Sequence, residues 1–501
     1  MIKDKYFSNP AALLFITLFG LTACSSDITL RSRSYAYTDV NIPMTQTVNE
    51  KTASGGVLQL ASANPVSTIN VVTDKNSYGN MRRAITHGEQ PSTVRLAEWL
   101  NYFSYDYPKP QGNTPLNAVI EIAPTPWNPS SKLMLVGVNA SSHTSTESPA
   151  NNIVVLVDIS DGMDSSAVVS LVKNTLKELK DKLRPQDKIA FVTFSSTPTI
   201  ALESTSGDEK SDIKSGIGHI DFGQTPTQSS AIGSFNLAYT VLENNMIKNG
   251  NNFILFITDG DLGTNENGIK SVEKTIARKN ASGITLSTLV FNTGKYNYQA
   301  MQKLADTGGG IHAYIDTQNE ANRVIEQQLA HGNKIVAQPV ELQVTFNPDY
   351  IRSYRLLGYE KNNTKTMAQD KSFANALREG QTFTALYEIQ TANNIPPELP
   401  HKYYDIGRVS VKYKLPYQAF NRTLDLSIVP SQIKTDSGKA SKDFSFAAAV
   451  AAFALQLKKD SGVNNYSIDN IIELANDGIG KDETGLRTEF VWLLENTKHV
   501  E

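Results

Sequence analysis

The sequence is almost without cysteine, and it carries no strong excess of charge. Among 501 residues the only cysteine is Cys24, which excludes intramolecular disulfides. The net charge is −3, so the charge gives no reason to expect nucleic acid or an anionic membrane surface as a partner. A phosphate-binding Gly-x-x-x-x-Gly-Lys-Ser/Thr sequence is also absent. The hydrophobic content of 40% is that of an ordinary globular protein, and the length predicts roughly three domains of ~150 residues each.

Long apolar runs are scarce too, and the first of them has the length of a signal-peptide core. Residues 11–23 are apolar apart from two threonines and one glycine, and two lysines precede them. This run is shorter than the ~20 residues that a membrane span needs. Residues 1–24 are therefore predicted to be a signal peptide.

The end of this run reads Leu-Thr-Ala-Cys and resembles the lipobox of bacterial lipoproteins. In that family the chain is cut before the cysteine, so the resemblance implies that Cys24 carries a lipid anchor. Ser25 follows it, which in Gram-negative lipoproteins implies the outer membrane. A plain signal peptide with an incidental cysteine is the alternative. Residues 25–64 are rich in Ser, Thr, Asn and Gly, and we expect them to be a flexible tether.

Residues 152–166 are the stretch around which we expect the fold to be organised. Residues 153–157 are an unbroken apolar run, which predicts a strand buried on both faces of a parallel sheet. Open α/β sheets bind ligands at the carboxyl ends of their strands. Carboxylates packed together there repel one another unless a cation or protons compensate. The polar residues at this strand end, which predict a hard divalent cation held by oxygen ligands, are Asp158, Ser160, Asp161 and Asp164.

Two later segments carry oxygen donors that are able to complete such a site. Residues 223–227 form a Gly-Gln-Thr-Pro-Thr loop with two hydroxyl groups. Residues 253–257 are a second apolar strand, closed by Thr258-Asp259-Gly260-Asp261. Ligands of this kind favour Mg²⁺ over zinc.

Taken together, these segments resemble the von Willebrand factor type A (VWA) domain with a metal-ion-dependent adhesion site. The family motif is Asp-x-Ser-x-Ser, then a distant Thr and a distant Asp, which Asp158, Ser160, Thr225 and Asp259 match. Gly162 stands where the second serine belongs, so the chain keeps four of the five ligand positions. The resemblance implies Mg²⁺ or Mn²⁺ as the cofactor, with an acidic residue of a protein partner completing the metal shell.

Strands and helices alternate between residues 151 and 330, which predicts an α/β fold. This alternation implies a doubly wound, mostly parallel sheet with helices on both faces. The expected strands are 153–157, 188–194, 253–257, 284–290 and 311–315, and the expected helices are 165–183, 208–218, 230–247, 267–280 and 297–306.

The segments on either side of this domain predict a β-sandwich. Residues 331–440 hold short strands rich in β-branched and aromatic residues at 340–346, 354–359, 382–389, 407–413 and 423–428. Residues 65–150 are predicted to form an N-terminal segment of two helices, at 81–89 and 94–103, and two strands, at 118–123 and 133–138. If these two strands join the later ones, the VWA domain is inserted into the sandwich.

Two further stretches are predicted to lie in the core. The aromatic cluster at 102–107 favours core packing over a binding surface. Residues 441–501 are expected to be helical, and 444–457 are nearly all apolar. As a helix these fourteen residues rise only ~21 Å, too little for a membrane span, so we expect a buried core helix capped by Asp443.

The whole arrangement resembles a group of bacterial lipoproteins with a central VWA domain and a C-terminal domain of unknown function. It implies a non-enzymatic cell-envelope protein that mediates adhesion or protein–protein interaction. A metal-free structural scaffold is the first alternative. A metal-dependent hydrolase using Asp158, Asp259 and Asp261 is the second, although no histidine lies near these residues. The resemblance is carried by residues 78–83, 99–107, 127–129, 346–348, 354–360, 384–388, 413–416 and 443–453.

Overall fold

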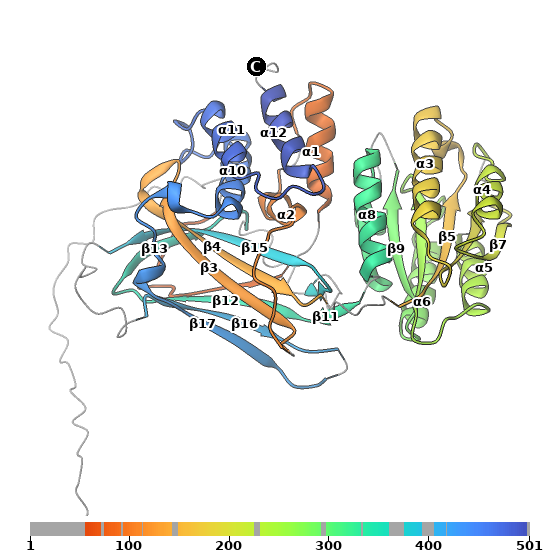
Figure 1. Cartoon of the computed structure of the whole chain (residues 1–501), viewed down its shortest axis with the longest axis horizontal. Helices are drawn as coiled ribbons and strands as arrows, with labels where there is room; N and C mark the ends of the chain where they lie inside the picture. Colours follow the sequence, from red (N-terminus) through yellow and green to blue (C-terminus); the bar gives the residue numbers. More distant parts are fainter. Residues whose placement is uncertain are drawn as a thin grey trace, which may run out of the picture. The chain divides into compact units, whose positions relative to one another are not determined.

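The computed structural model describes residues 56–71, 75–91, 94–112, 114–142, 149–224, 231–291, 297–331, 334–359, 375–392, 405–416 and 418–497 (Figure 1). The predicted signal peptide and Cys24 lie outside these residues. The predicted tether, residues 25–64, ends earlier than expected. A short strand, β1 (Gln59–Leu60), pairs with the later strand β13, and Ala61 is buried.

The α/β prediction for the central part of the chain is confirmed. Its six strands form one sheet in the order β10-β9-β8-β5-β6-β7, in which only β7 runs antiparallel to its neighbour. Every residue of β5 is buried, as the apolar run predicts. The strand order reverses where β5 lies beside β8. The strands are β5 (Asn151–Asp158), β6 (Lys188–Phe194), β7 (Ile200–Ser206), β8 (Asn251–Thr258), β9 (Thr285–Val290) and β10 (Gly309–Tyr314).

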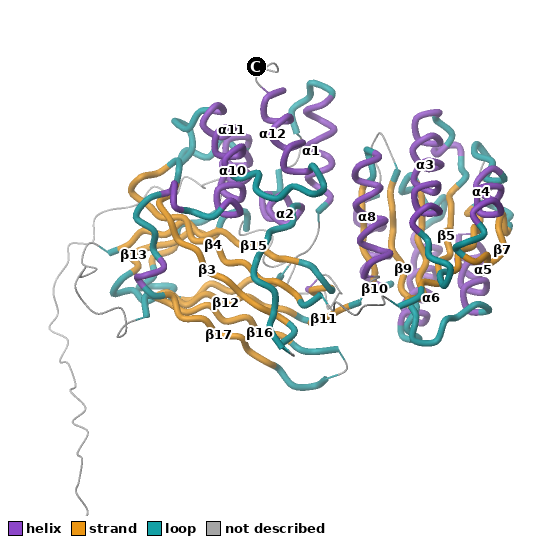
Figure 2. The backbone as a smooth tube through the Cα atoms, in the orientation of Figure 1, coloured by secondary structure: helices purple, strands orange, loops and turns teal. Residues whose placement is uncertain are grey.

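Helices cover both faces of this sheet (Figures 1 and 2). The alternation along β5 decides which face each side chain meets, since Val155 packs into one core cluster and Val154 into the other. One face is covered by α3 (Ser166–Lys182), α4 (Lys210–Gly218) and α8 (Gln318–His331). The other is covered by α5 (Ala231–Glu243), α6 (Glu266–Asn280) and α7 (Tyr298–Thr307).

Two antiparallel sheets form the predicted β-sandwich. The first has the order β1-β13-β15-β4-β3 and the second β17-β16-β12-β2. Since β3 and β4 precede the central domain in the chain and β12 to β17 follow it, the VWA domain is inserted into the sandwich. The strands are β2 (Val66–Asn70), β3 (Leu116–Thr125), β4 (Asn128–Ala140), β12 (Val340–Phe346), β13 (Ile351–Leu356), β15 (Thr382–Thr391), β16 (Gly407–Tyr413) and β17 (Arg422–Ile428), with β11 (Ile335–Ala337) and β14 (Leu377–Arg378) paired separately.

The strand β4 separates two cores. Its residues Met134 and Val136 face the second sheet, whereas Leu133 and Leu135 face a layer of helices. This layer also buries the aromatic cluster at 102–107, so its prediction as core is confirmed. The helices are α1 (Asn76–Thr86), α2 (Leu96–Tyr102), α10 (Lys442–Leu457), α11 (Ile468–Asp477) and α12 (Leu486–Thr497).

The apolar helix α10 is buried in this layer, as predicted, but its cap is a different residue. The hydroxyl of Ser441 accepts a hydrogen bond from the backbone N–H of Phe444 at 3.1 Å. Asp443 is not the cap, because the helix begins at Lys442 and places Asp443 inside the first turn, where it pairs with Arg487 at 2.6 Å. Of the helices that the structure describes, none is long and apolar enough to span a bilayer.

Candidate functional site

An open cleft of about 320 Å³ lies at the carboxyl ends of β5 and β8, where the strand order reverses. Ligands of open α/β sheets bind at this place, because the loops diverge there and leave a crevice. The cleft is lined by Asp158, Ser160, Asp161, Gly162, Phe194, Ser195, Ser196, Gln224, Ala231, Asp259, Asp261, Leu262 and Gly263. Three of the four predicted metal ligands are among them. The fourth, Thr225, lies outside the described residues.

Asp158 is the last residue of β5 and is completely buried. Its Oδ1 accepts the backbone N–H of Ser160 at 3.0 Å, and its Oδ2 accepts the hydroxyl of Thr258 at 2.8 Å. Burial raises the pKa of Asp158 to about 7, and the nearby Asp259 carboxylate adds to this rise. A cation in the cleft would relieve both effects, because it favours the ionised form.

Ser160 is held at the mouth of the cleft by backbone contacts. It forms an isolated parallel bridge with Gln224, and the backbone N–H of Gln224 donates to the carbonyl of Ile159 at 2.9 Å. Gln224, the residue before the predicted ligand Thr225, therefore lies beside Ser160.

Asp259 follows β8 and is half-buried. Its Oδ1 accepts the backbone N–H of Asp261 at 2.9 Å. Burial is the main cause that raises the pKa of Asp259 above its ordinary value. Two carboxylates from neighbouring strands thus reach one cleft, and burial disfavours the charge of each.

Thr258 has a different role from the one its sequence position suggests. Sequence reasoning placed its hydroxyl among the oxygen donors of the site. In the structure the hydroxyl is buried and donates to Asp158 while it accepts the backbone N–H of Gly260 at 3.0 Å. Thr258 therefore positions Asp158 and holds the turn that carries Asp259.

The remaining carboxylates of these loops, those of Asp161, Asp164 and Asp261, are more exposed to solvent than Asp158 and Asp259. Asp161 and Asp261 line the cleft but are exposed, and Asp164 is exposed and does not line it. Within the described ranges, no three residues of the types His, Cys, Asp and Glu form a group that could hold a metal ion. A cation at this cleft would therefore depend on hydroxyl groups and water beside its two carboxylates.

The donor set fits the cation that the sequence implies. Carboxylate and hydroxyl oxygens are the ligands that Mg²⁺ and Mn²⁺ prefer. The place of the missing serine is not empty, since a Cβ atom on Gly162 would lie 1.8 Å from Oδ2 of Asp259. Oxygen donors that follow β5 and β8 therefore lie together in the cleft, around Gly162.

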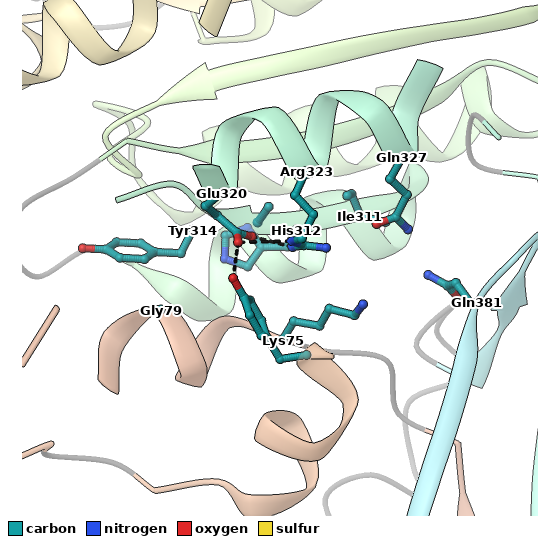
Figure 3. Close-up of a pocket in the computed structure, with 11 residues that line it drawn as sticks. Lys75, Gly79, Ile311, His312, Tyr314, Glu320, Arg323, Gln327 and Gln381 are labelled. Carbon is teal, nitrogen blue, oxygen red and sulfur yellow. Dashed lines mark hydrogen bonds and ion pairs between the residues drawn. The ribbon is translucent and has the colours of Figure 1, made fainter. Parts of the chain in front are cut away.

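A second group of buried charges lies where α8 meets α1 and α2 (Figure 3). Glu320 of α8 bonds to Arg323 and to the hydroxyl of Tyr102. Although burial acts in the opposite direction, Arg323 and Arg82 lower the pKa of Glu320 to about 2. The space between these side chains is about 30 Å³. The charges link α8 to α1 and α2.

Family models match three parts of the chain. The von Willebrand factor type A domain model matches residues 152–328. A model described as von Willebrand factor matches residues 46–135. A third, the C-terminal region of the uncharacterized protein YfbK, matches residues 334–500.

The fold and the cleft define a protein built around a VWA domain. An Escherichia coli (strain K12) protein, the uncharacterized protein YfbK, is 32% identical to this chain over 456 residues, which cover 86% of this chain and 78% of that protein. The chain belongs to the YfbK family of VWA-domain proteins.

Solved structures that resemble the chain are more distant. BatB from Bacteroides thetaiotaomicron is 19% identical, with a TM-score of 0.31, over 36% of this chain and 98% of its own. A von Willebrand factor type A protein from Catenulispora acidiphila is 14% identical, with a TM-score of 0.37, over 77% of this chain and 91% of its own. These values are too low to carry any conclusion about function.

Proposed function

We propose that this chain is a non-enzymatic cell-envelope protein that binds a protein partner through Mg²⁺ or Mn²⁺ at the cleft between β5 and β8. Asp158, Ser160, Thr225 and Asp259 would hold the ion. The observation that carries the proposal is the meeting of the Asp158 and Asp259 carboxylates at the point where the strand order reverses. When bound, the ion would supply an electrophilic site for an oxygen donor of the partner, which we expect to be an acidic residue.

Interaction is favoured over hydrolysis by the side chains around the cleft. The described lining residues include no histidine, and Asp261 is an exposed carboxylate that accepts the backbone N–H of Gly263 at 2.9 Å. A hydrolase would need a general base within reach of a metal-bound water. Among the described lining residues, only the exposed carboxylates Asp161 and Asp261 are available for that role, and the backbone N–H of Gly263 already engages Asp261.

Attachment to the outer membrane of a Gram-negative bacterium through a lipid on Cys24 is the second part of the proposal. It is supported by the Leu-Thr-Ala-Cys sequence and by the apolar run before it. Mass measurement of the chain extracted from membranes tests it directly. An unmodified Cys24 in the mature chain would refute the anchor.

The metal site is tested by calorimetric titration of Mg²⁺ and Mn²⁺ into the full-length chain in detergent. We expect saturable binding that Asp259→Ala abolishes, because the variant removes one of two carboxylates. The matched control is Asp212→Ala, which removes an exposed carboxylate on α4 of the same domain and should bind like the unaltered chain. Absence of binding to the unaltered chain would refute the metal-dependent mechanism and favour the metal-free scaffold.

A further inference from the structure

The space beside Gly162 is occupied by the carboxylate of Asp259. A Cβ atom at Gly162 would lie 1.8 Å from Oδ2 and 2.9 Å from Cγ of Asp259. Real Cβ atoms do not approach other atoms below about 3 Å, since repulsion rises steeply at such distances. No residue other than glycine therefore fits at position 162 while Asp259 keeps this orientation.

The backbone alone does not require glycine at this position. Gly162 lies in a short 3₁₀ helix, η1 (Asp161–Met163), and it is not among the glycines with positive φ. A side chain at position 162 would meet no conformational strain of the left-handed kind. The requirement for glycine comes from the close approach of Asp259.

Asp259 is held in this orientation by the turn that ends β8. The backbone N–H of Asp261 bonds to Oδ1, which leaves Oδ2 directed over Gly162. A second hydrogen bond stabilises the same turn, because the backbone N–H of Gly260 donates to the buried hydroxyl of Thr258. The approach to Gly162 therefore follows from the local fold at the end of β8.

We infer that Oδ2 of Asp259, which the motif already makes a metal ligand, reaches the ion through the space of the missing second serine, and that Gly162 is the residue that admits it. In the family motif the side chain of residue 162 supplies a hydroxyl oxygen, whereas here Oδ2 of Asp259 lies in that space. The inference rests on the proposed metal site. Gly162 and Asp259 then form a matched pair, so the glycine does not indicate a degraded site.

The exchange leaves the number of carboxylates around the ion unchanged, because Asp259 already belongs to the motif. It removes one neutral hydroxyl oxygen, so the ion would keep two carboxylates among fewer protein ligands. The two interpretations of Gly162 then predict opposite effects when the serine of the motif is restored.

The test is a calorimetric titration of Mn²⁺ into the full-length chain and its Gly162→Ser variant. If Asp259 occupies the serine position, the new side chain displaces it, and we expect binding at least ~10-fold weaker. If the site is merely degraded, the restored hydroxyl strengthens binding, and that result would overturn the inference. The matched control is Gly218→Ser at the end of α4, where a Cβ meets nothing within 4 Å, and it should bind like the unaltered chain.

A double variant shows whether Gly162→Ser weakens binding by competing with Asp259 for one position or by disrupting the local structure. If residues 162 and 259 compete for the same space, Gly162→Ser should improve Mn²⁺ binding once the carboxylate is removed by Asp259→Ala. The double variant should then bind more tightly than Asp259→Ala alone, and equal or weaker binding contradicts the pairing. Lack of Mn²⁺ binding by the unaltered chain refutes the proposed function, whereas binding that Gly162→Ser strengthens refutes only this inference.

Discussion

At the scale of single residues, the candidate site depends on a buried hydroxyl as much as on its carboxylates. Thr258 donates to Asp158 at 2.8 Å and accepts from the backbone of Gly260. A completely buried carboxylate such as Asp158 needs these donors, because it has lost its contact with water. The sequence identifies the oxygen donors of the site, but it does not show that the Thr258 hydroxyl positions the Asp158 carboxylate.

Thr258→Val tests this positioning role, since valine keeps the shape of threonine and removes only the hydroxyl. We expect a loss of about 1–3 kcal/mol in unfolding free energy, because the variant leaves a buried acceptor with one donor fewer. Mn²⁺ affinity should also fall by roughly 10–100-fold. Urea denaturation and calorimetric titration measure the two effects.

The matched control for this prediction is Thr240→Val on α5. Thr240 is exposed, and its hydroxyl bonds only to the carbonyl one turn earlier, at 2.9 Å. Its loss should change both quantities little. A Thr258→Val variant with unaltered stability and Mn²⁺ affinity would show that Asp158 is held by other groups.

At the scale of elements, apolar patterns identified the buried strands and helices, and polar elements were missed. The strand β7 has no fully buried residue, and α8 buries mainly Ala321, Val324 and Ile325 on an otherwise polar helix. β7 lies at the edge of its sheet, where few apolar residues are needed, whereas one side of α8 meets α1 and α2 through buried polar contacts such as that of Glu320 with Tyr102. The predicted apolar run also begins two residues after the start of α10, because the first two residues of the helix, Lys442 and Asp443, are polar.

Ser441→Ala tests the cap that the structure assigns to α10. The serine hydroxyl accepts the N–H of Phe444 and donates to Glu121 at 2.6 Å, so its removal should cost about 1–2 kcal/mol. Thermal or urea denaturation followed by circular dichroism measures this loss. Ser445→Ala, one turn further along α10, is the control, and it should be neutral or slightly stabilising because alanine favours helix. Equal effects of the two variants would argue against the assigned cap.

At the scale of the whole described chain, buried ion pairs join segments that are far apart in the sequence. Arg82 of α1 pairs with Asp316, which follows β10, and donates to Glu489 of α12 at 3.0 Å. It also donates to the hydroxyl of Tyr102 at 2.9 Å. One buried guanidinium therefore links the N-terminal helices, the VWA domain and the C-terminal helices.

Arg82→Ala should destabilise the protein by about 3–5 kcal/mol, because it leaves buried carboxylates without their counter-charge. The adjacent Arg83 supplies the control, since it is more exposed and pairs with Glu89 only at 3.8 Å. Arg83→Ala should cost no more than about 1 kcal/mol. Denaturation with urea distinguishes the two, and similar costs would show that the buried cluster contributes little to stability.

The sequence by itself determined the parallel domain, the strands of the β-sandwich, the buried helix α10 and the strand ends that carry Asp158 and Asp259, but it left open whether the strands before the domain join the sandwich. These features follow from local patterns, since apolar runs and their polar ends are properties of neighbouring residues. Only the tertiary structure decided that the Asp259 carboxylate lies over Gly162 and that the Thr258 hydroxyl donates a hydrogen bond to Asp158. The ion pairs of Arg82 with Asp316 and Glu489 likewise depend on it. Those contacts join residues about 100 to 400 positions apart, and they depend on how the elements pack, which no local pattern records.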